Sequence, residues 1–222
     1  MLLASKPLKT IFVLDFGSHR FHDLGIRAMI YTTRPRHPHK MKPMYTVEEQ
    51  NLDTQLAAIQ HRLPQNESVL VHLGRNSTTF VPLPQPQSKE IEFGILSHDI
   101  HIGVEQLAND YFQHDIPGEP ELDHAINCIE DELMRNLVLT SGGRKLISAD
   151  KLHAALFDVD KGMAEFSREQ VEQLFTRYAW LSMGRATTTD NLQTSKQAYA
   201  ALLILREIMH HLDYRQVLIV AD

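Results

Sequence analysis

The stretch Ser68-Val69-Leu70-Val71-His72-Leu73-Gly74-Arg75-Asn76-Ser77-Thr78-Thr79-Phe80-Val81-Pro82 decides the fold class of this 222-residue chain. Residues 68–73 predict a strand, residues 74–77 a polar turn, and residues 78–82 a second extended segment. This order is the pattern of a β-hairpin. Helical patterns follow and precede the hairpin, and strands mixed with helices indicate an α/β fold.

Further elements are predicted on both sides of the hairpin. The apolar run 10–14 is typical of a strand buried on both faces. Thr46 and Glu49 have the spacing of a capping box and open a helix that continues to about Leu63. The other expected strands are 90–96, 137–139 and 216–221. Helices are expected at 103–112 and 119–134. Three more are expected: one that begins at Ser148 or Asp150, one that begins at Ser167 with Gln170 in its capping box, and one from Thr194 or Ser195 to Leu212.

Composition limits the class of protein. Apolar residues make up 43% and charged residues 23%, as in soluble globular proteins, and 222 residues allow one large or two small domains. A net charge of −6 excludes a generally basic nucleic-acid coat, so no nucleic-acid partner is predicted. No apolar stretch approaches the ~20 residues of a membrane span, so no membrane partner is predicted either. The single cysteine, Cys128, forms no intrachain disulfide and favours a cytoplasmic location.

Basic residues gather near the N-terminus. Eight Lys and Arg lie between Lys6 and Lys42, where the only acidic residues are Asp15 and Asp23. Such a surface attracts an anionic ligand such as a phosphate chain. The turn and breaker residues of 34–39 favour a solvated loop instead. Both interpretations stay open.

Three turns rich in Gly, Ser and Thr are the candidates for phosphate binding. They are 15–18, 72–78 and 140–144, and each is expected to follow a strand. Glycine lets backbone N–H groups approach a phosphate, and ligands of open α/β sheets bind at the carboxyl ends of strands. The predicted phosphate-binding residues are Ser18, Gly74, Arg75, Asn76, Ser77, Thr78, Ser141 and Gly142.

The order of these motifs resembles the exopolyphosphatase/guanosine pentaphosphate phosphohydrolase (Ppx/GppA) family of the actin-like superfamily. That family has a Gly-Glu-Glu-Glu-Ala helix start, an Asp-Ile-Gly-Gly-Gly-Ser-Thr-Glu strand and turn, a Leu-Gly-x-x-Arg-Leu-Thr-Glu-x-Phe segment, a Thr-Ser-Gly loop, and a closing helix followed by a strand. The similar segments here are 47–51, 72–79, 102–112, 140–142, 194–212 and 217–222. The resemblance covers residues 46–222, and upstream only Asp15-Phe16-Gly17-Ser18 is similar to the family's opening motif.

The resemblance implies an α/β, actin-like ATPase (ribonuclease H-like) fold with two halves. The expected domains are a reduced first half, 1–66, and a near-complete second half, 67–222, with a helix-rich C-terminal part. Family enzymes hydrolyse a terminal phosphoanhydride with Mg²⁺ that carboxylates hold. Gln50, His72 and Thr79 stand at the three family carboxylate positions, where none of them favours Mg²⁺ binding as a carboxylate does. Arg75-Asn76 replaces the family's glycine pair.

These departures predict an exopolyphosphatase-related protein with a phosphate-binding crevice and a degenerate hydrolytic site. It would bind a polyphosphate or nucleotide-type ligand, or act in regulation, and it is a possible homodimer. One alternative is an active Mg²⁺-dependent phosphohydrolase that uses Asp15 as a metal ligand together with Glu49. Another is a non-catalytic interaction protein without a ligand. The sequence leaves open whether the chain is an enzyme.

Other groups of polar or aromatic residues have simpler explanations. His98-Asp99-Ile100-His101 lacks a closed metal-ligand set. His19, His22, Asp15 and Asp23 are expected to be exposed loop residues rather than a metal cluster. His210-His211 suits the dipole at a helix C-terminus. Cys128 is predicted to be a small buried residue, and Phe175, Tyr178 and Trp180 to belong to the core.

Overall fold

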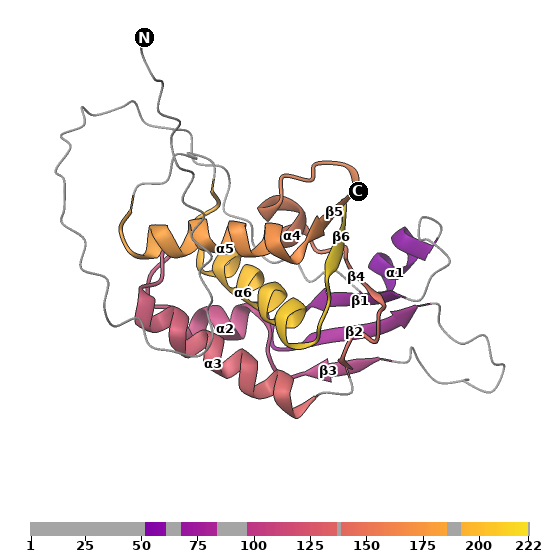
Figure 1. The fold of residues 1–222 in the computed structure, drawn as a ribbon, viewed down its shortest axis with the longest axis horizontal. Coiled ribbons are helices and arrows are strands. Elements are labelled where there is room, and N and C mark those ends of the chain that lie inside the picture. The colour runs from indigo at the N-terminus through magenta and orange to yellow at the C-terminus, as the bar shows by residue number, and fades with distance from the viewer. Residues whose placement is uncertain (1–51, 61–67, 84–96, 137–138, 186–191, 222) are drawn as a thin grey trace, which may run out of the picture. The chain divides into compact units, whose positions relative to one another are not determined.

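The structure is a computed structural model, and it describes residues 52–60, 68–83, 97–136, 139–185 and 192–221 (Figure 1). All of them belong to the unit Lys42–Asp222, one of the two units into which the chain divides. The predicted strand 10–14, the turn 15–18, Gln50 and the predicted strand 90–96 lie outside the described residues. The predicted domain boundary between residues 66 and 67 remains a prediction.

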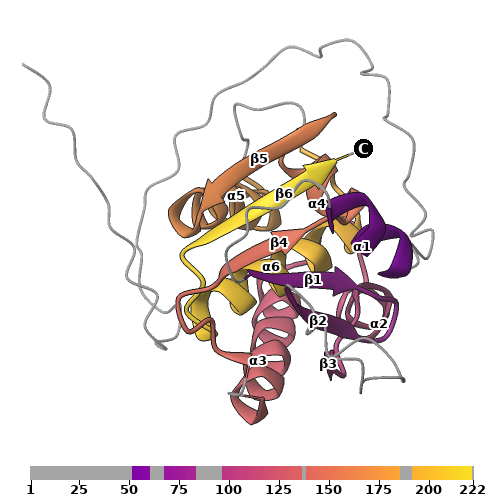
Figure 2. The same cartoon turned by 90° about the vertical axis from the view of Figure 1, so that its right-hand side faces the viewer.

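The described residues form a six-stranded mixed sheet with the strand order β3-β2-β1-β4-β6-β5 (Figure 2). Strands β1, β4 and β6 run parallel, while β2, β3 and β5 are antiparallel to their neighbours. The strand bounds are Ser68–Leu73 for β1, Thr78–Leu83 for β2, His98–Ile100 for β3, Lys145–Ser148 for β4, Gly162–Ser167 for β5 and Gln216–Ala221 for β6. Parallel strands with helical connections confirm the predicted α/β class.

Six helices accompany the sheet in the described part of the chain. Their bounds are Leu52–Gln60 for α1, Val104–Tyr111 for α2, Glu119–Arg135 for α3, Lys151–Leu156 for α4, Arg168–Ser182 for α5 and Lys196–His211 for α6. The predicted capping box at α5 is confirmed, because Ser167 Oγ accepts from Gln170 N and Gln170 Oε1 accepts from Ser167 N. Ser195 caps α6 by accepting from Ala198 N at 3.1 Å. None of the described helices is long and apolar enough to cross a membrane.

The two faces of the sheet are covered unequally (Figure 2). On one face, α1 places Leu56 and Ile59 against Leu70, Val81 and other sheet residues. On the other face, α2 to α6 share one larger apolar core with the alternate residues of the strands. Helix α6 lies at the centre of this core and is buried on nearly every side. Because side chains alternate along a strand, each residue of β1 is assigned to one of these two faces.

The described residues differ from the sequence-based expectations at three places. A short strand was expected at 137–139. Leu139, its one described residue, is not in a strand, and β4 begins only at Lys145. Strand β5 was not predicted, because it lies at the edge of the sheet and its largely exposed residues lack the apolar pattern of a buried strand. Trp180 is 41% exposed rather than buried, whereas Tyr178 and Phe175 do lie in the core.

Candidate functional site

The hairpin turn between β1 and β2 lies at the carboxyl end of β1, next to the start of α2. Gly74 N donates to Ser77 O at 2.8 Å and closes the turn. The carbonyl oxygens of Gly74 and Arg75 accept from Val104 N and Gln106 N, each at 3.0 Å. The turn thus satisfies backbone donors that the first turn of a helix leaves unpaired. Those two N–H groups are therefore already used by the protein and do not serve an anion.

Close packing holds the same turn in place. A Cβ atom added to Gly103 would come within 2.3 Å of the Arg75 carbonyl group, so only glycine fits where α2 begins. Thr78 is buried, and its hydroxyl donates to Ile102 O at 2.7 Å. Thr78 therefore acts as an anchor of the turn, although it was predicted as a phosphate ligand.

The side chains of Arg75 and Asn76 are the exposed part of this turn. Arg75 Nε lies 3.4 Å from Glu105 Oε2, and the arginine side chain is 53% exposed. An exposed ion pair of this kind contributes little to stability, so a guanidinium held in it stays available to an anionic ligand. Asn76 and the half-buried Ser77 lie beside it in the chain.

His72 and Thr79 are direct cross-strand partners in the β1–β2 pair. They lie on the sheet face that α1 covers, because His72 is two residues from Leu70, Thr79 is two residues from Val81, and residues i and i+2 share a face. The register thus brings together two of the three positions at which the resembled family has carboxylates. The third, Gln50, lies outside the described residues. Sequence spacing alone does not give this register.

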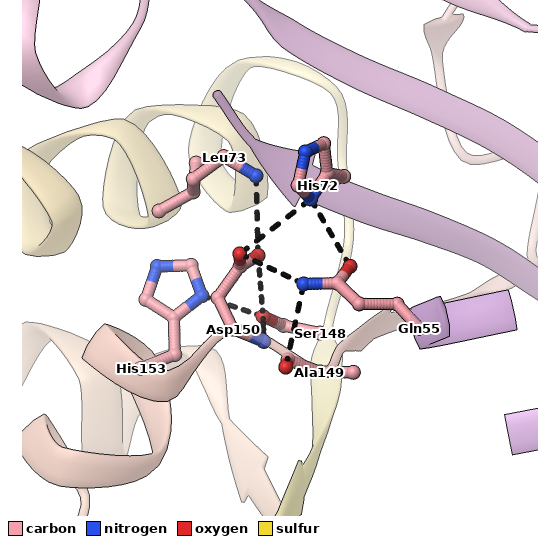
Figure 3. A network of polar contacts seen from close by, with 7 residues as sticks. All are labelled: Gln55, His72, Leu73, Ser148, Ala149, Asp150 and His153. Atoms are coloured by element: carbon pink, nitrogen blue, oxygen red, sulfur yellow. Dashed lines mark hydrogen bonds and ion pairs between the residues drawn. The ribbon is translucent and has the colours of Figure 1, made fainter. Parts of the chain in front are cut away.

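A buried carboxylate lies beside His72 (Figure 3). Asp150, which directly precedes α4, is 6% exposed. Its Oδ2 accepts from Leu73 N at 3.1 Å, and its Oδ1 accepts from Gln55 Nε2 at 3.1 Å and lies 3.7 Å from His72 Nδ1. Both carboxylate oxygens are therefore already engaged by protein donors.

Gln55 of α1 connects Asp150 to His72. Its Oε1 lies 3.1 Å from His72 Nδ1, and because an amide oxygen only accepts, Nδ1 carries the proton. The Nδ1 proton of His72 is therefore directed to Gln55 and is not available to a ligand. Sequence reasoning missed Gln55, and it assigned Asp150 only to a helix start. The available signal was that Gln55 is a polar residue next to the apolar residues of the same helix.

Ser148 and His153 extend this network into the core (Figure 3). Ser148 Oγ lies 2.7 Å from His153 Nδ1, and His153 Nε2 lies 3.2 Å from the Ala201 carbonyl oxygen. The carbonyl only accepts, so His153 donates from Nε2 and accepts at Nδ1. Burial lowers the pKa of His153, while the Asp150 carboxylate and the Ala201 carbonyl oppose that shift. Since Ser148 and His153 are both fully buried, the pair is structural rather than nucleophilic.

Ser141 and Gly142 lie at the amino ends of the parallel strands, whereas Gly74 lies at the carboxyl end of β1. Their turn precedes β4, and β4 pairs in parallel with β1 so that Lys145 lies beside Ser68. Ser141 Oγ donates to Asp213 O at 2.8 Å. A turn that precedes a parallel strand lies at its amino end, so Ser141 and Gly142 are not beside the hairpin turn at the carboxyl end of β1. Their predicted phosphate binding stays a prediction.

The described residues do not form a magnesium site near His72 and Thr79. Mg²⁺ prefers several oxygen ligands and octahedral geometry. In the described part of the chain, the carboxylate next to His72 is Asp150, and its oxygens are committed to Leu73 and Gln55. Asp15, the predicted metal ligand, and Ser18 lie outside the described residues.

The comparisons with known proteins agree with this architecture. No protein-family model matches the chain. No curated protein matches it either. Its structure is similar to crystal structures of the Aquifex aeolicus Ppx/GppA family member, with a TM-score of 0.57 at 18% identity over 75% of this chain in one case, and 0.54 at 17% identity over the same share in another. An exopolyphosphatase from Cytophaga hutchinsonii matches with a TM-score of 0.50 at 13% identity over 73% of this chain.

These likenesses define the class of fold. The chain has an α/β fold of the actin-like ATPase type that the Ppx/GppA structures share. The match spans 56% and 57% of the two Aquifex chains, in the order given above, and 56% of the exopolyphosphatase. The predicted resemblance to exopolyphosphatases is therefore confirmed at the level of the fold.

Proposed function

We propose that this chain is an exopolyphosphatase-related protein that binds a phosphorylated ligand at the hairpin turn Gly74–Ser77 and has a degenerate hydrolytic site. The observation that carries the proposal is the cross-strand pair of His72 and Thr79. In the resembled family these positions hold carboxylates, and here a histidine and a threonine face each other instead.

The loss of negative charge at this pair removes what phosphoanhydride hydrolysis requires. Such reactions depend on metal ions that neutralise phosphate charge and on a group that activates water. An imidazole and a hydroxyl do not supply the negative charge that holds Mg²⁺, and the nearby Asp150 is held by Leu73 and Gln55. Retention of the fold without these carboxylates supports binding without turnover.

Arg75 supports the binding part of the proposal. It is the exposed cation at the end of β1, where open α/β sheets bind ligands, and the hairpin backbone is fixed against α2. A fixed turn presents Arg75, Asn76 and Ser77 to a phosphate with little ordering cost. The proposed ligand class is a polyphosphate or a nucleotide-type phosphate, because the resembled family acts on phosphoanhydrides and a guanidinium can form two charge-assisted hydrogen bonds with a phosphate group.

The test is calorimetric titration of the chain with polyphosphate of uniform length at low ionic strength. We expect binding that weakens with salt and that weakens roughly 5- to 10-fold in Arg75→Ala, the loss of one charge-assisted hydrogen bond. Arg135→Ala is the matched control, since Arg135 is also an exposed arginine paired with one glutamate. Equal affinities in all three proteins would refute binding at this turn.

A phosphate-release assay with polyphosphate and Mg²⁺ tests the lost hydrolysis. We expect no release above a heat-inactivated control. Release that Asp15→Asn abolishes would instead support the active phosphohydrolase. Absence of both binding and release would favour the interaction protein.

A further inference from the structure

A second cluster of potential metal ligands lies between α3 and α6. It consists of Glu130 on α3 together with Glu207 and His211 on α6, and one ligand atom from each lies within 4.8 Å of the others. The end of α6 leads into the start of β6, so the cluster is on the side of the sheet away from the turn Gly74–Ser77. It has no part in the function proposed above.

The spacing of the three ligand atoms fits a small cation. His211 Nε2 lies 3.2 Å from Glu130 Oε1 and 3.3 Å from Glu207 Oε2. Ligands about 2.1 Å from a tetrahedral zinc ion are roughly 3.4 Å apart, which is close to both separations. Glu207 and His211 are four residues apart, so they project from the same side of α6.

One buried oxygen atom in this cluster receives no hydrogen bond. Glu207 is fully buried, and its Oε1 pairs with Arg206, but its Oε2 has no hydrogen-bond donor. His211 Nε2 lies at nearly the same distance from Glu130 Oε1 and Glu207 Oε2, and both carboxylates raise the pKa of His211, Glu207 most. A single Nε2 proton therefore has to serve two carboxylate oxygens. A buried carboxylate oxygen without a donor costs free energy, and a cation between the three groups removes that cost.

The surrounding charges permit a dication. When a metal ion replaces the Nε2 proton of His211, the two glutamates and the neutral imidazole carry two negative charges. Arg206 lies beside them and pairs with both Glu207 and Glu172. His210 packs its ring against that of His211 with a centroid distance of 5.3 Å. His211 and Glu130 are only partly buried, so water can complete the coordination of an ion held by three protein ligands.

We propose that Glu130, Glu207 and His211 bind one divalent transition-metal ion of the zinc class, which links α3 to α6. A set of one imidazole nitrogen and two carboxylate oxygens suits Zn²⁺, whereas Mg²⁺ and Ca²⁺ prefer oxygen ligands alone. The ion stabilises the packing of the central helix against α3.

The test uses the full chain after treatment with EDTA and dialysis, titrated with ZnCl₂ by calorimetry and followed by thermal unfolding. Zn²⁺ at about 100 Kd should raise Tm by roughly 5–10 °C. Mg²⁺ at the same concentration should leave Tm unchanged. The chain contains 13 histidines, so stoichiometry alone does not identify the site.

Matched variants identify it. Glu130→Gln and His211→Gln should each lower Zn²⁺ affinity at least 10-fold and remove the Tm shift. Asp131→Asn and His124→Gln, at exposed positions of α3, should bind as the parent does. Circular dichroism establishes that each variant is folded. Zinc affinity and a Tm shift that persist unchanged in Glu130→Gln and His211→Gln would overturn the proposal, as would the lack of any Tm shift in the parent chain.

Discussion

Two turns of similar composition lie at opposite ends of the parallel strands β1 and β4. The turn Gly74–Ser77 follows β1 and gives its carbonyl groups to α2, while its side chains Arg75 and Asn76 stay exposed. The turn 140–144 precedes β4, and Ser141 makes hydrogen bonds to the connection between α6 and β6. The first turn therefore suits ligand contact, and the second joins elements of the fold.

The glycines of the two regions meet different demands. Gly103, which packs on the first turn, is required by the close approach of the Arg75 backbone. Gly142 in the second turn has a φ of 56°, and nothing lies near its missing side chain. One position excludes a methyl group by contact, and the other disfavours it only through its backbone conformation.

The largest expected loss of stability distinguishes the close packing at Gly103 from the left-handed backbone at Gly142. Gly103→Ala should destabilise the protein by about 3 kcal/mol, because backbone atoms must move to accept the new Cβ. Gly142→Ala should cost only about 1 kcal/mol, the cost of a left-handed backbone for alanine. Urea unfolding of both variants measures the difference, and equal losses would contradict the close packing of α2 on the hairpin turn.

The next effect concerns the buried carboxylate next to the first turn. Asp150→Ala should reduce the free energy of unfolding by about 2–3 kcal/mol, since Leu73 N and Gln55 Nε2 then lose their acceptor. Asp150→Asn keeps one acceptor oxygen and should cost less. Asp131→Ala, at an exposed position of α3, serves as the control and should change stability by no more than about 0.5 kcal/mol. A loss in Asp150→Ala as small as in this control would contradict the network.

A pH dependence follows from His153 in the same network. Its folded-state pKa is lowered by burial, so the native protein favours the neutral ring and the unfolded chain takes up the proton first. The contribution of His153 to stability is complete above the unfolded pKa of about 6.5 and decreases as the pH falls below it, by at most about 1.4 kcal/mol per pH unit. Urea unfolding between pH 5 and 8 measures this slope.

A conservative variant isolates the histidine in that measurement. His153→Gln removes the titrating group, so its stability should depend less on pH below about 6.5 than that of the parent chain. If the two proteins lose stability in parallel over this range, other groups determine the slope and the assignment to His153 is wrong.

The smallest effect on stability is expected at the exposed part of the first turn. Arg75→Ala removes only a half-exposed ion pair with Glu105 and should change the free energy of unfolding by less than about 0.5 kcal/mol. Ser141→Ala should leave polyphosphate affinity unchanged, because Ser141 lies at the other end of the parallel strands. A loss of affinity in Ser141→Ala that equals that in Arg75→Ala would contradict this division between the two turns.

Local sequence signals were sufficient where hydrophobic pattern and capping chemistry agree. The hairpin 68–82, the capping box at Ser167 and the long helix that ends near Leu212 were predicted, because each depends on residues close together in the chain. The edge strand Gly162–Ser167 was missed, since its pairing with β6 determines its conformation. Trp180 was misassigned because it lies two residues from the buried Tyr178, which on a helix places it on roughly the opposite side.

The sequence by itself determined the α/β class, the resemblance to exopolyphosphatases and the replacement of the expected carboxylates by Gln50, His72 and Thr79. Only the tertiary structure decided which polar residues meet. Strand register placed His72 opposite Thr79, parallel pairing separated Ser141 from Gly74, and helix packing brought Glu130 to Glu207 and His211. The physical reason is that these contacts join residues far apart in the chain, and their positions depend on strand pairing and core packing rather than on local periodicity.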